Sequence, residues 1–122
     1  MRLKNEIVRD VLLILEEELG FGQEINKEDF LSIDKIKTHD VHDVLYTLKK
    51  LNEAKLIELR FTSDGGFLIM DITFDGHQFL ANIRDPEIWA KTKSAAGVVG
   101  GASLSVIGEL AINYVRKTIG LD

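Results

Sequence analysis

The spacing of apolar residues changes its period twice along this 122-residue chain, and this change limits the folds that it can adopt. Residues 3–54 and 74–93 carry apolar residues at helical spacing, whereas residues 56–61 and 67–72 form short, partly alternating runs typical of strands. Ser63-Asp64-Gly65-Gly66 separates the two runs, and Asp-Gly at such a place is a strong hairpin signal. We therefore expect one β-hairpin between two groups of helices.

Three helices are expected before the hairpin. The first covers Leu3 to Leu19 and ends at the glycines that follow, and the second starts with Asn26 as its N-cap and reaches about Ile36. The third runs from Thr38 to Ala54, and its buried stripe should consist of Val41, Val44, Leu45, Leu48 and Leu51.

Helical spacing returns after the hairpin, with Phe74, Phe79, Leu80 and Ile83. Asp85-Pro86-Glu87 opens a further helix, since an aspartate N-cap, a proline at the first position and an acidic first turn favour helix starts. A tail helix follows the glycine-rich stretch 97–101, which is the expected hinge.

Three helices followed by a hairpin are the order of a winged helix-turn-helix, an α+β fold that is mainly α. Two strands alone cannot bury their apolar face, so they must pack on the helices. We predict a winged-helix domain over residues 1–83 and a C-terminal helical extension over residues 84–122, which packs on that domain or dimerises.

Charge and cysteine content exclude several functions. The chain has 20 acidic and 15 basic residues, a net charge of -5 and no cysteine. Disulfide scaffolds, thiolate nucleophiles and cysteine-based metal sites are therefore excluded.

Acidic residues interrupt the apolar N-terminal stretch, unlike a signal peptide, and the uncharged run 94–108 is shorter than the roughly 20 residues of a membrane span. We expect a soluble, cytoplasmic protein with no membrane association.

Two segments resemble known families. The segment from His42 to Ile57 resembles the third helix of winged-helix regulators, often written L-x-x-L-x-E-A-G-L-I. Lys55 stands where those families usually have glycine, so a left-handed helix cap is less favourable here and a different helix end is expected.

The segment from Ile72 to Lys93 resembles the signature L-T-W-x-G-H-x-F-L-D-x-I-R-D-x-x-x-W-x-K-x-K. That signature belongs to a bacterial and prophage family named domain of unknown function twenty-five-thirteen. The chain departs from it at Ile72, Phe74 and Ala81. The resemblance implies a winged-helix fold and frequent occurrence in mobile elements, but no activity and no catalytic residues.

The third helix is where helix-turn-helix proteins contact the major groove. Its outward side and the adjoining strand offer candidate contacts to DNA or to a protein partner: His39, Asp43, Tyr46, Lys49, Lys50 and Arg60. Net charge is -3 over residues 1–60, -3 over residues 61–83 and +1 over residues 84–122, so no region is a clear phosphate-binding patch. A protein partner is therefore favoured, and DNA binding by a dimer that gathers basic residues on one surface is the alternative.

Other chemical signals are weak. His39-Asp40-x-His42-Asp43 has a spacing used by metal-binding helices but lacks further ligands, and Asp75-Gly76-His77 has no accompanying nucleophile or phosphate loop. Trp89 is expected to serve packing. We expect no catalytic residues, no cofactor and no metal, and hence no enzyme.

The tail helix has a wide apolar face made of Leu104, Ile107, Leu110, Ala111, Tyr114 and Val115. Gly97, Gly101 and Ser105 fall four residues apart, a spacing that permits close approach of helices. This pattern predicts a homodimer through residues 101–119, with packing onto the first helix of the same chain as the alternative.

The leading hypothesis is a non-enzymatic winged-helix interaction module associated with phages or mobile elements. The alternative is a dimeric DNA-binding transcriptional regulator.

Overall fold

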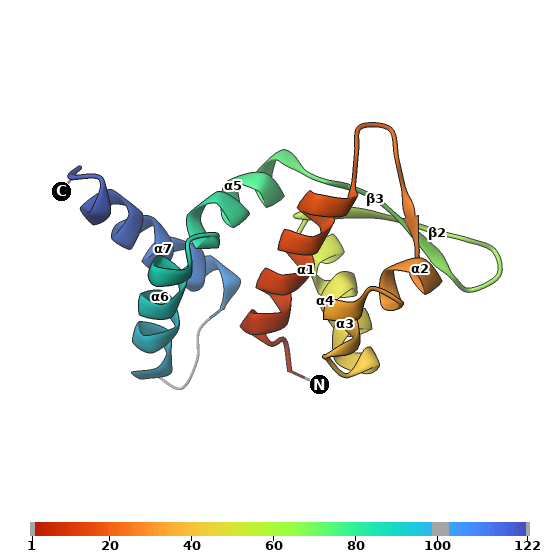
Figure 1. Ribbon diagram of the computed structural model, residues 1–122, viewed down its shortest axis with the longest axis horizontal. Helices are drawn as coiled ribbons and strands as arrows, with labels where there is room; N and C mark the ends of the chain where they lie inside the picture. The colour runs from red at the N-terminus through yellow and green to blue at the C-terminus, as the bar shows by residue number, and fades with distance from the viewer. Residues whose placement is uncertain (1, 99–102, 122) are drawn as a thin grey trace. The chain divides into compact units, whose positions relative to one another are not determined.

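The computed structural model describes residues 2–98 and 103–121 and divides into two compact units, Met1–His77 and Gln78–Asp122. Unit 1 contains, in order, α1 (Asn5–Glu18), β1 (Ile25–Asn26), α2 (Lys27–Leu31), α3 (Asp34–Lys37), α4 (Val41–Glu53), β2 (Ile57–Phe61) and β3 (Phe67–Ile72) (Figure 1). Unit 2 contains α6 (Pro86–Val98) and α7 (Leu104–Thr118), and α5 (Phe74–Ile83) crosses the division. The described chain is thus mainly helical α+β, as expected. The division falls within α5, whereas we expected it at residue 83, the end of that helix.

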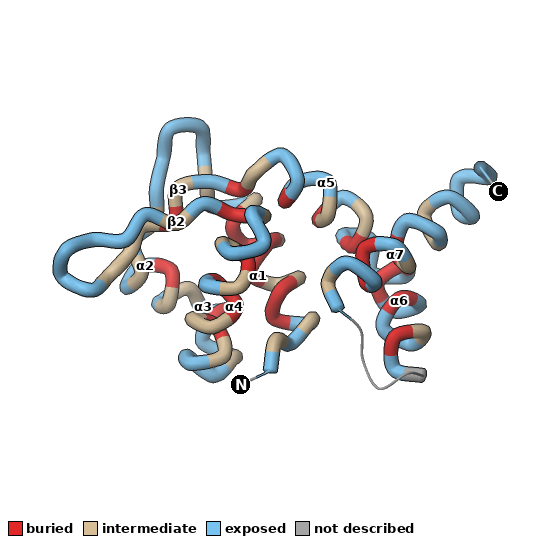
Figure 2. The backbone as a smooth tube through the Cα atoms, turned by 180° about the vertical axis from the view of Figure 1, so that it is seen from behind, coloured by how far each residue is buried: buried red, intermediate tan, exposed pale blue. Residues whose placement is uncertain are grey.

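The core of unit 1 forms where the apolar stripe of α1 meets α4 and β3. Figure 2 shows buried segments along the facing sides of α1 and α4. Burying one large aliphatic side chain contributes about 1.5–3 kcal/mol, so this cluster holds the helices and the sheet together. Its members include Val8, Val11, Leu12, Leu15, Phe30, Ile36, Val44, Leu48, Leu51, Ile57, Ile69 and Ile72.

The sheet has three antiparallel strands in the order β1-β3-β2. The expected β2-β3 hairpin forms, and a third strand that was not expected joins it, because Ile25 and Asn26 pair with Ile69 and Leu68 on the far side of β3. Two residues are too short a run for a period to be recognised in the sequence. A register shift between Glu58 and Leu59 interrupts the β2-β3 ladder.

The segment expected to form one helix from Asn26 to Ile36 forms two, α2 and α3. The N-cap was correct: Asn26 Oδ1 accepts from the backbone N–H of Asp29 at 2.8 Å. The break comes at Ser32, whose hydroxyl donates to the carbonyl of Asp29, and Ile33 is extended. Serine competes for backbone hydrogen bonds in this way at helix ends.

The end of α4 keeps the left-handed cap that its sequence disfavours. Lys55 has φ 62°. Its N–H donates to the carbonyl of Asn52, and the N–H of Leu56 donates to the carbonyl of Leu51. These two bonds form a Schellman motif with lysine in the position of the usual glycine. The expectation of a different helix end was wrong, because the following strand requires the chain to turn here.

The start of α5 is fixed directly against this cap. The Thr73 hydroxyl donates to the carbonyl of Lys55 at 2.7 Å, and the backbone N–H of Thr73 donates to the carbonyl of Leu56 at 3.0 Å. The same hydroxyl accepts from the N–H of Gly76 at 3.0 Å, so Thr73 caps α5. Gly76 then lies so close to Leu56 that no larger residue fits.

The expected packing of α4 was partly wrong. Phe74, an apolar residue of the next helical run, is 76% exposed at the first position of α5, and Val41, which was expected in the buried stripe, is 44% exposed at the first position of α4. Thr47 is buried instead, and its hydroxyl is satisfied by the carbonyl of Asp43 at 2.7 Å.

Unit 2 is built on the pairing of α6 with α7. Asp85 Oδ1 accepts from the N–H groups of Glu87 and Ile88, which confirms Asp85 as N-cap and Pro86 as the first residue of α6. Trp89 is buried, in keeping with its expected packing role. Gly97 lies on α6 and Ser105 on α7, so the predicted stripe of small residues on one helix was wrong. Gly101 and the rest of the expected hinge after residue 98 lie outside the described residues.

Candidate interaction surface

Helix α4 begins at a strong cap and buries one face. Asp40 Oδ1 accepts from the N–H groups of His42 and Asp43, at 2.9 and 3.2 Å. Val44, Thr47, Leu48 and Leu51 face the core. The helix is thereby fixed by its N-terminus and its inner side, so its outer residues lie in a defined arrangement.

The outer side of α4 is mixed in character. Val41, His42, Lys49 and Glu53 are exposed. Leu45 and Tyr46 between them are half-buried. Lys49 and the half-buried Lys50 against Glu53 give this face a net charge of only +1 at neutral histidine. Its N-terminal end exposes Val41 beside His42.

Two predicted contact residues are held by α1 and by the segment before it. His39 Nε2 lies 2.8 Å from Asp10 Oδ2, and Lys35 Nζ lies 3.7 Å from Asp10 Oδ1. Asp43 Oδ2 accepts from Lys4 Nζ at 2.8 Å. Both side chains are only about a fifth exposed, 21% for His39 and 18% for Asp43. They therefore connect elements of unit 1, and the solvent side of α4 is rotated from the one that the sequence indicated.

The other predicted contacts do reach the surface. Lys50 Nζ donates to Glu53 Oε1 at 3.1 Å and lies 5.3 Å from the centre of the Tyr46 ring. The hydrogen bond and charge of Glu53 raise the pKa of Lys50. Lys49 and Arg60 are exposed. The basic side chains available to a phosphate backbone are thus few, and one of them is already paired with a carboxylate.

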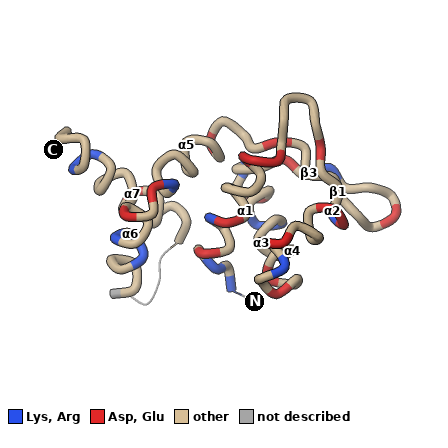
Figure 3. Tube along the Cα trace, in the orientation of Figure 1, with Lys and Arg blue, Asp and Glu red and all other residues tan. Residues whose placement is uncertain are grey.

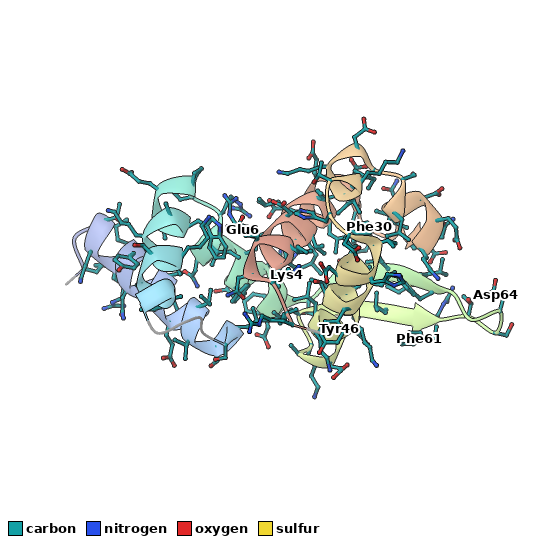
Figure 4. All side chains as sticks on the ribbon, turned by 90° about the horizontal axis from the view of Figure 1, so that it is seen from below. Lys4, Glu6, Phe30, Tyr46, Phe61 and Asp64 are labelled. Carbon is teal, nitrogen blue, oxygen red and sulfur yellow. The ribbon has the colours of Figure 1, made fainter. Side chains whose placement is uncertain are left out.

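The β2-β3 turn carries a negative charge at its tip (Figures 3 and 4). The Asp64 carboxylate accepts from the Thr62 hydroxyl and from the Gly66 N–H, and these bonds lower the pKa of Asp64. Phe61, at the base of the turn, is 65% exposed and makes an edge-on contact with Phe67, with 6.3 Å between ring centres. This turn would repel a phosphate and offers an aromatic side chain instead.

The edge of β2 beside α4 is partly closed. Asn52 Oδ1 on α4 accepts from the N–H of Leu59 at 3.0 Å, at the point where the register shift interrupts the ladder. Such a bond satisfies an edge donor and fixes the hairpin to α4. The outer side of α4 and the β2-β3 turn therefore belong to one rigid part of unit 1.

A pocket of about 410 Å³ lies elsewhere in unit 1. The loop between α1 and β1 supplies six of its ten lining residues, and β2, β3 and the start of α5 supply the rest. Its polar and aromatic lining residues are Phe21, Gln23, Glu24, Glu58, Asp71 and His77. No sequence pattern predicted this pocket, because its residues come from segments far apart and share no motif.

The predicted dimer face of α7 is partly used within the chain. Ile107 and Ala111 are buried, and a side chain added at Gly108 would contact the Phe79 ring at 3.5 Å. Leu104, Leu110, Tyr114 and Val115 are half-buried. Packing of α7 on α6 explains the buried part of the face. Residues 101 and 102 of the predicted interface lie outside the described residues.

The described residues hold no group of three His, Asp or Glu side chains that could bind one metal ion. None of the helices in residues 2–98 and 103–121 is both long and apolar enough to cross a membrane.

These features define a mainly helical α+β protein with a small antiparallel sheet. The chain belongs to the family described as Hypothetical protein (DUF2513), whose model matches residues 2–102. No curated protein and no solved structure matches it significantly. The family resemblance drawn from residues 72–93 is thereby confirmed.

Proposed function

We propose that this chain is a non-enzymatic winged-helix module that binds another protein through the outer side of α4 and the β2-β3 turn. The order of elements in unit 1 and the strand order β1-β3-β2 support the winged-helix assignment, with α4 as the recognition helix and β2-β3 as the wing. Association with phages or mobile elements is part of this proposal and rests on the family resemblance.

The observation that carries the proposal is the chemistry of this surface. Val41 and Phe61 are exposed, and of the two lysines on the outer side of α4, Lys49 and Lys50, the second is paired with Glu53. Exposed apolar and aromatic side chains among few charges are typical of protein interfaces, whereas DNA-binding surfaces are strongly basic.

A matched pair of substitutions tests the protein interface. Val41→Asp introduces a charge at the start of α4, and Val106→Asp introduces the same charge in the first turn of α7, at 44% and 43% exposure. Both positions tolerate aspartate because an acid in a first turn favours a helix. In affinity capture from the source cell, a specific partner should be lost with Val41→Asp and retained with Val106→Asp. Equal retention by both variants would refute an interface on α4.

DNA binding is the second candidate, favoured by the winged-helix order itself. If Lys49, Lys50 and Arg60 each contact a phosphate, affinity for mixed duplex DNA should fall about 40-fold between roughly 50 and 200 mM salt. Lys49→Glu with Lys50→Glu should then abolish binding in an anisotropy titration. Absence of binding at low salt eliminates this candidate.

Homodimerisation through α7 is a separate proposal. The half-buried Leu104, Leu110, Tyr114 and Val115 support it, since they leave apolar surface on the side of α7 that α6 does not fully cover. Sedimentation of the full chain over a range of concentrations tests it, with Leu110→Asp as the variant. A chain that stays monomeric at all concentrations refutes the dimer.

A further inference from the structure

The pocket in unit 1 has a wall that is ordered by its own hydrogen bonds. In the loop between α1 and β1, the N–H of Gly20 donates to Gln23 Oε1 at 3.1 Å, and the N–H of Gln23 donates to the carbonyl of Gly20 at 3.0 Å. Gly22 takes the left-handed conformation, φ 74°, that glycine adopts freely. The loop therefore holds its shape without burying Phe21, which is fully exposed at the pocket.

The lining of the pocket is negatively charged. Three carboxylate side chains line it, from Glu24, Glu58 and Asp71, and no lysine or arginine is among its lining residues. Glu58 and Asp71 are also direct partners across β2 and β3. Like charges in directly opposed positions destabilise a sheet, and a cation bound between these two exposed carboxylates would relieve the repulsion.

The lining residues favour an organic cation over a metal ion. Although Glu24, Glu58, Asp71 and His77 all line the pocket, no three such side chains among the described residues are close enough to bind one metal. A guanidinium group is planar and wide, and it can donate to two separate carboxylates at once. A volume of about 410 Å³ falls within the range of small-ligand pockets.

The remaining lining residues suit the rest of such a side chain. The exposed Phe21 ring offers a face to a cation, an attraction that is strongest for arginine-type groups. Leu19 and Met70 offer apolar contacts to a methylene stem.

We propose that this pocket binds an arginine side chain of a partner protein. The carboxylates of Glu58 and Asp71 accept from its guanidinium, and Phe21 stacks on it. The inference rests on the proposed interaction function but uses a surface other than α4, so the two can fail separately.

The test uses the full chain and a blocked tripeptide, acetyl-Gly-Arg-Gly-amide, at low salt. Backbone amide shifts in nitrogen-15 NMR spectra should move for Phe21, Glu58 and Asp71, with an apparent Kd of roughly 0.1–10 mM for so small a ligand. The same peptide with citrulline, which lacks the charge, should move none of them.

Matched substitutions assign the contacts. Phe21→Ala should weaken binding about 2- to 5-fold, while Phe74→Ala, a change at another exposed phenylalanine, should leave it unchanged. Glu58→Gln should weaken binding about 10-fold or more, while Glu109→Gln on α7 should not. Because Glu58→Gln also removes the repulsion by Asp71, it should raise the Tm by about 1–4 °C. Weaker peptide binding together with a higher Tm is a combination that a purely structural residue would not show.

Three results would overturn the proposal: no shifts at the pocket with the arginine peptide, equal shifts with citrulline, or tighter binding of Mg²⁺ alone at the same amides. A duplex DNA titration of the same sample reports separately on α4. Shifts on α4 with DNA and on the pocket with the peptide would refute the proposed protein interface on α4 while supporting the arginine site.

Discussion

Gly76 occupies a position where the backbones of two elements meet. An added Cβ would overlap the carbonyl oxygen of Leu56, and it would lie 2.7 Å from Cγ2 of Ile72 and 3.0 Å from the carbonyl carbon of Leu56. The Leu56 carbonyl cannot withdraw freely, because it accepts from the N–H of Thr73. We therefore expect Gly76→Ala to displace the start of α5 from the end of α4.

The size of the effect follows from three contributions. Forcing an extra methyl group into a packed site costs about 1–3 kcal/mol, and weakening the bond from Thr73 to Leu56 costs about 0.5–1.5 kcal/mol. Alanine in place of glycine within a helix stabilises the folded state by about 1 kcal/mol. The free energy of unfolding should thus fall by about 2 kcal/mol, a large part of the ~5–15 kcal/mol typical of a domain.

Urea unfolding followed by far-ultraviolet circular dichroism measures this change. The midpoint should fall with an unchanged m-value, because the compactness of the folded state is kept. Gly97→Ala is the control: the residue is exposed on α6, and nothing lies within 4 Å of an added Cβ. That variant should be as stable as the parent chain or up to about 1 kcal/mol more stable. A Gly76→Ala chain as stable as Gly97→Ala would refute the close approach.

Three further changes test the turns and caps of unit 1. Lys55→Gly should raise the urea midpoint by the equivalent of about 0.5 kcal/mol, because it relieves roughly 1–2 kcal/mol of left-handed strain but loosens the unfolded chain; a lower midpoint would contradict the strained cap. The Asp64 carboxylate has a lowered pKa in the folded turn, so its stabilising bonds are complete above the ordinary aspartate pKa and are lost as pH falls through the lower folded value. The amide shift of Gly66 should therefore titrate with a midpoint below about 3.9, and a midpoint at or above that value would show that the turn is not held by this carboxylate. Asp40→Ala removes the cap of α4 and should lower the free energy of unfolding by about 1 kcal/mol in the same urea assay, whereas no change would mean that water caps the helix equally well.

The sequence predicted the features that depend on near neighbours. The caps at Asn26 and Asp85 and the turn at Asp64-Gly65 are each decided by bonds within three or four residues. The two periods of apolar residues likewise predicted which segments are helices and which are strands. These signals are local, so no knowledge of the fold is needed to read them.

The tertiary structure decided the features that depend on distant partners. His39 faces Asp10 from 29 positions away, and Ile25 becomes a strand residue only because Ile69 lies beside it. The pocket likewise exists because strand register places Glu58 opposite Asp71 and the loop carrying Phe21 supplies other residues of the same lining. Burial and strand register depend on which surfaces pack together. The spacing of apolar residues in one segment contains no information about the segment that packs against it.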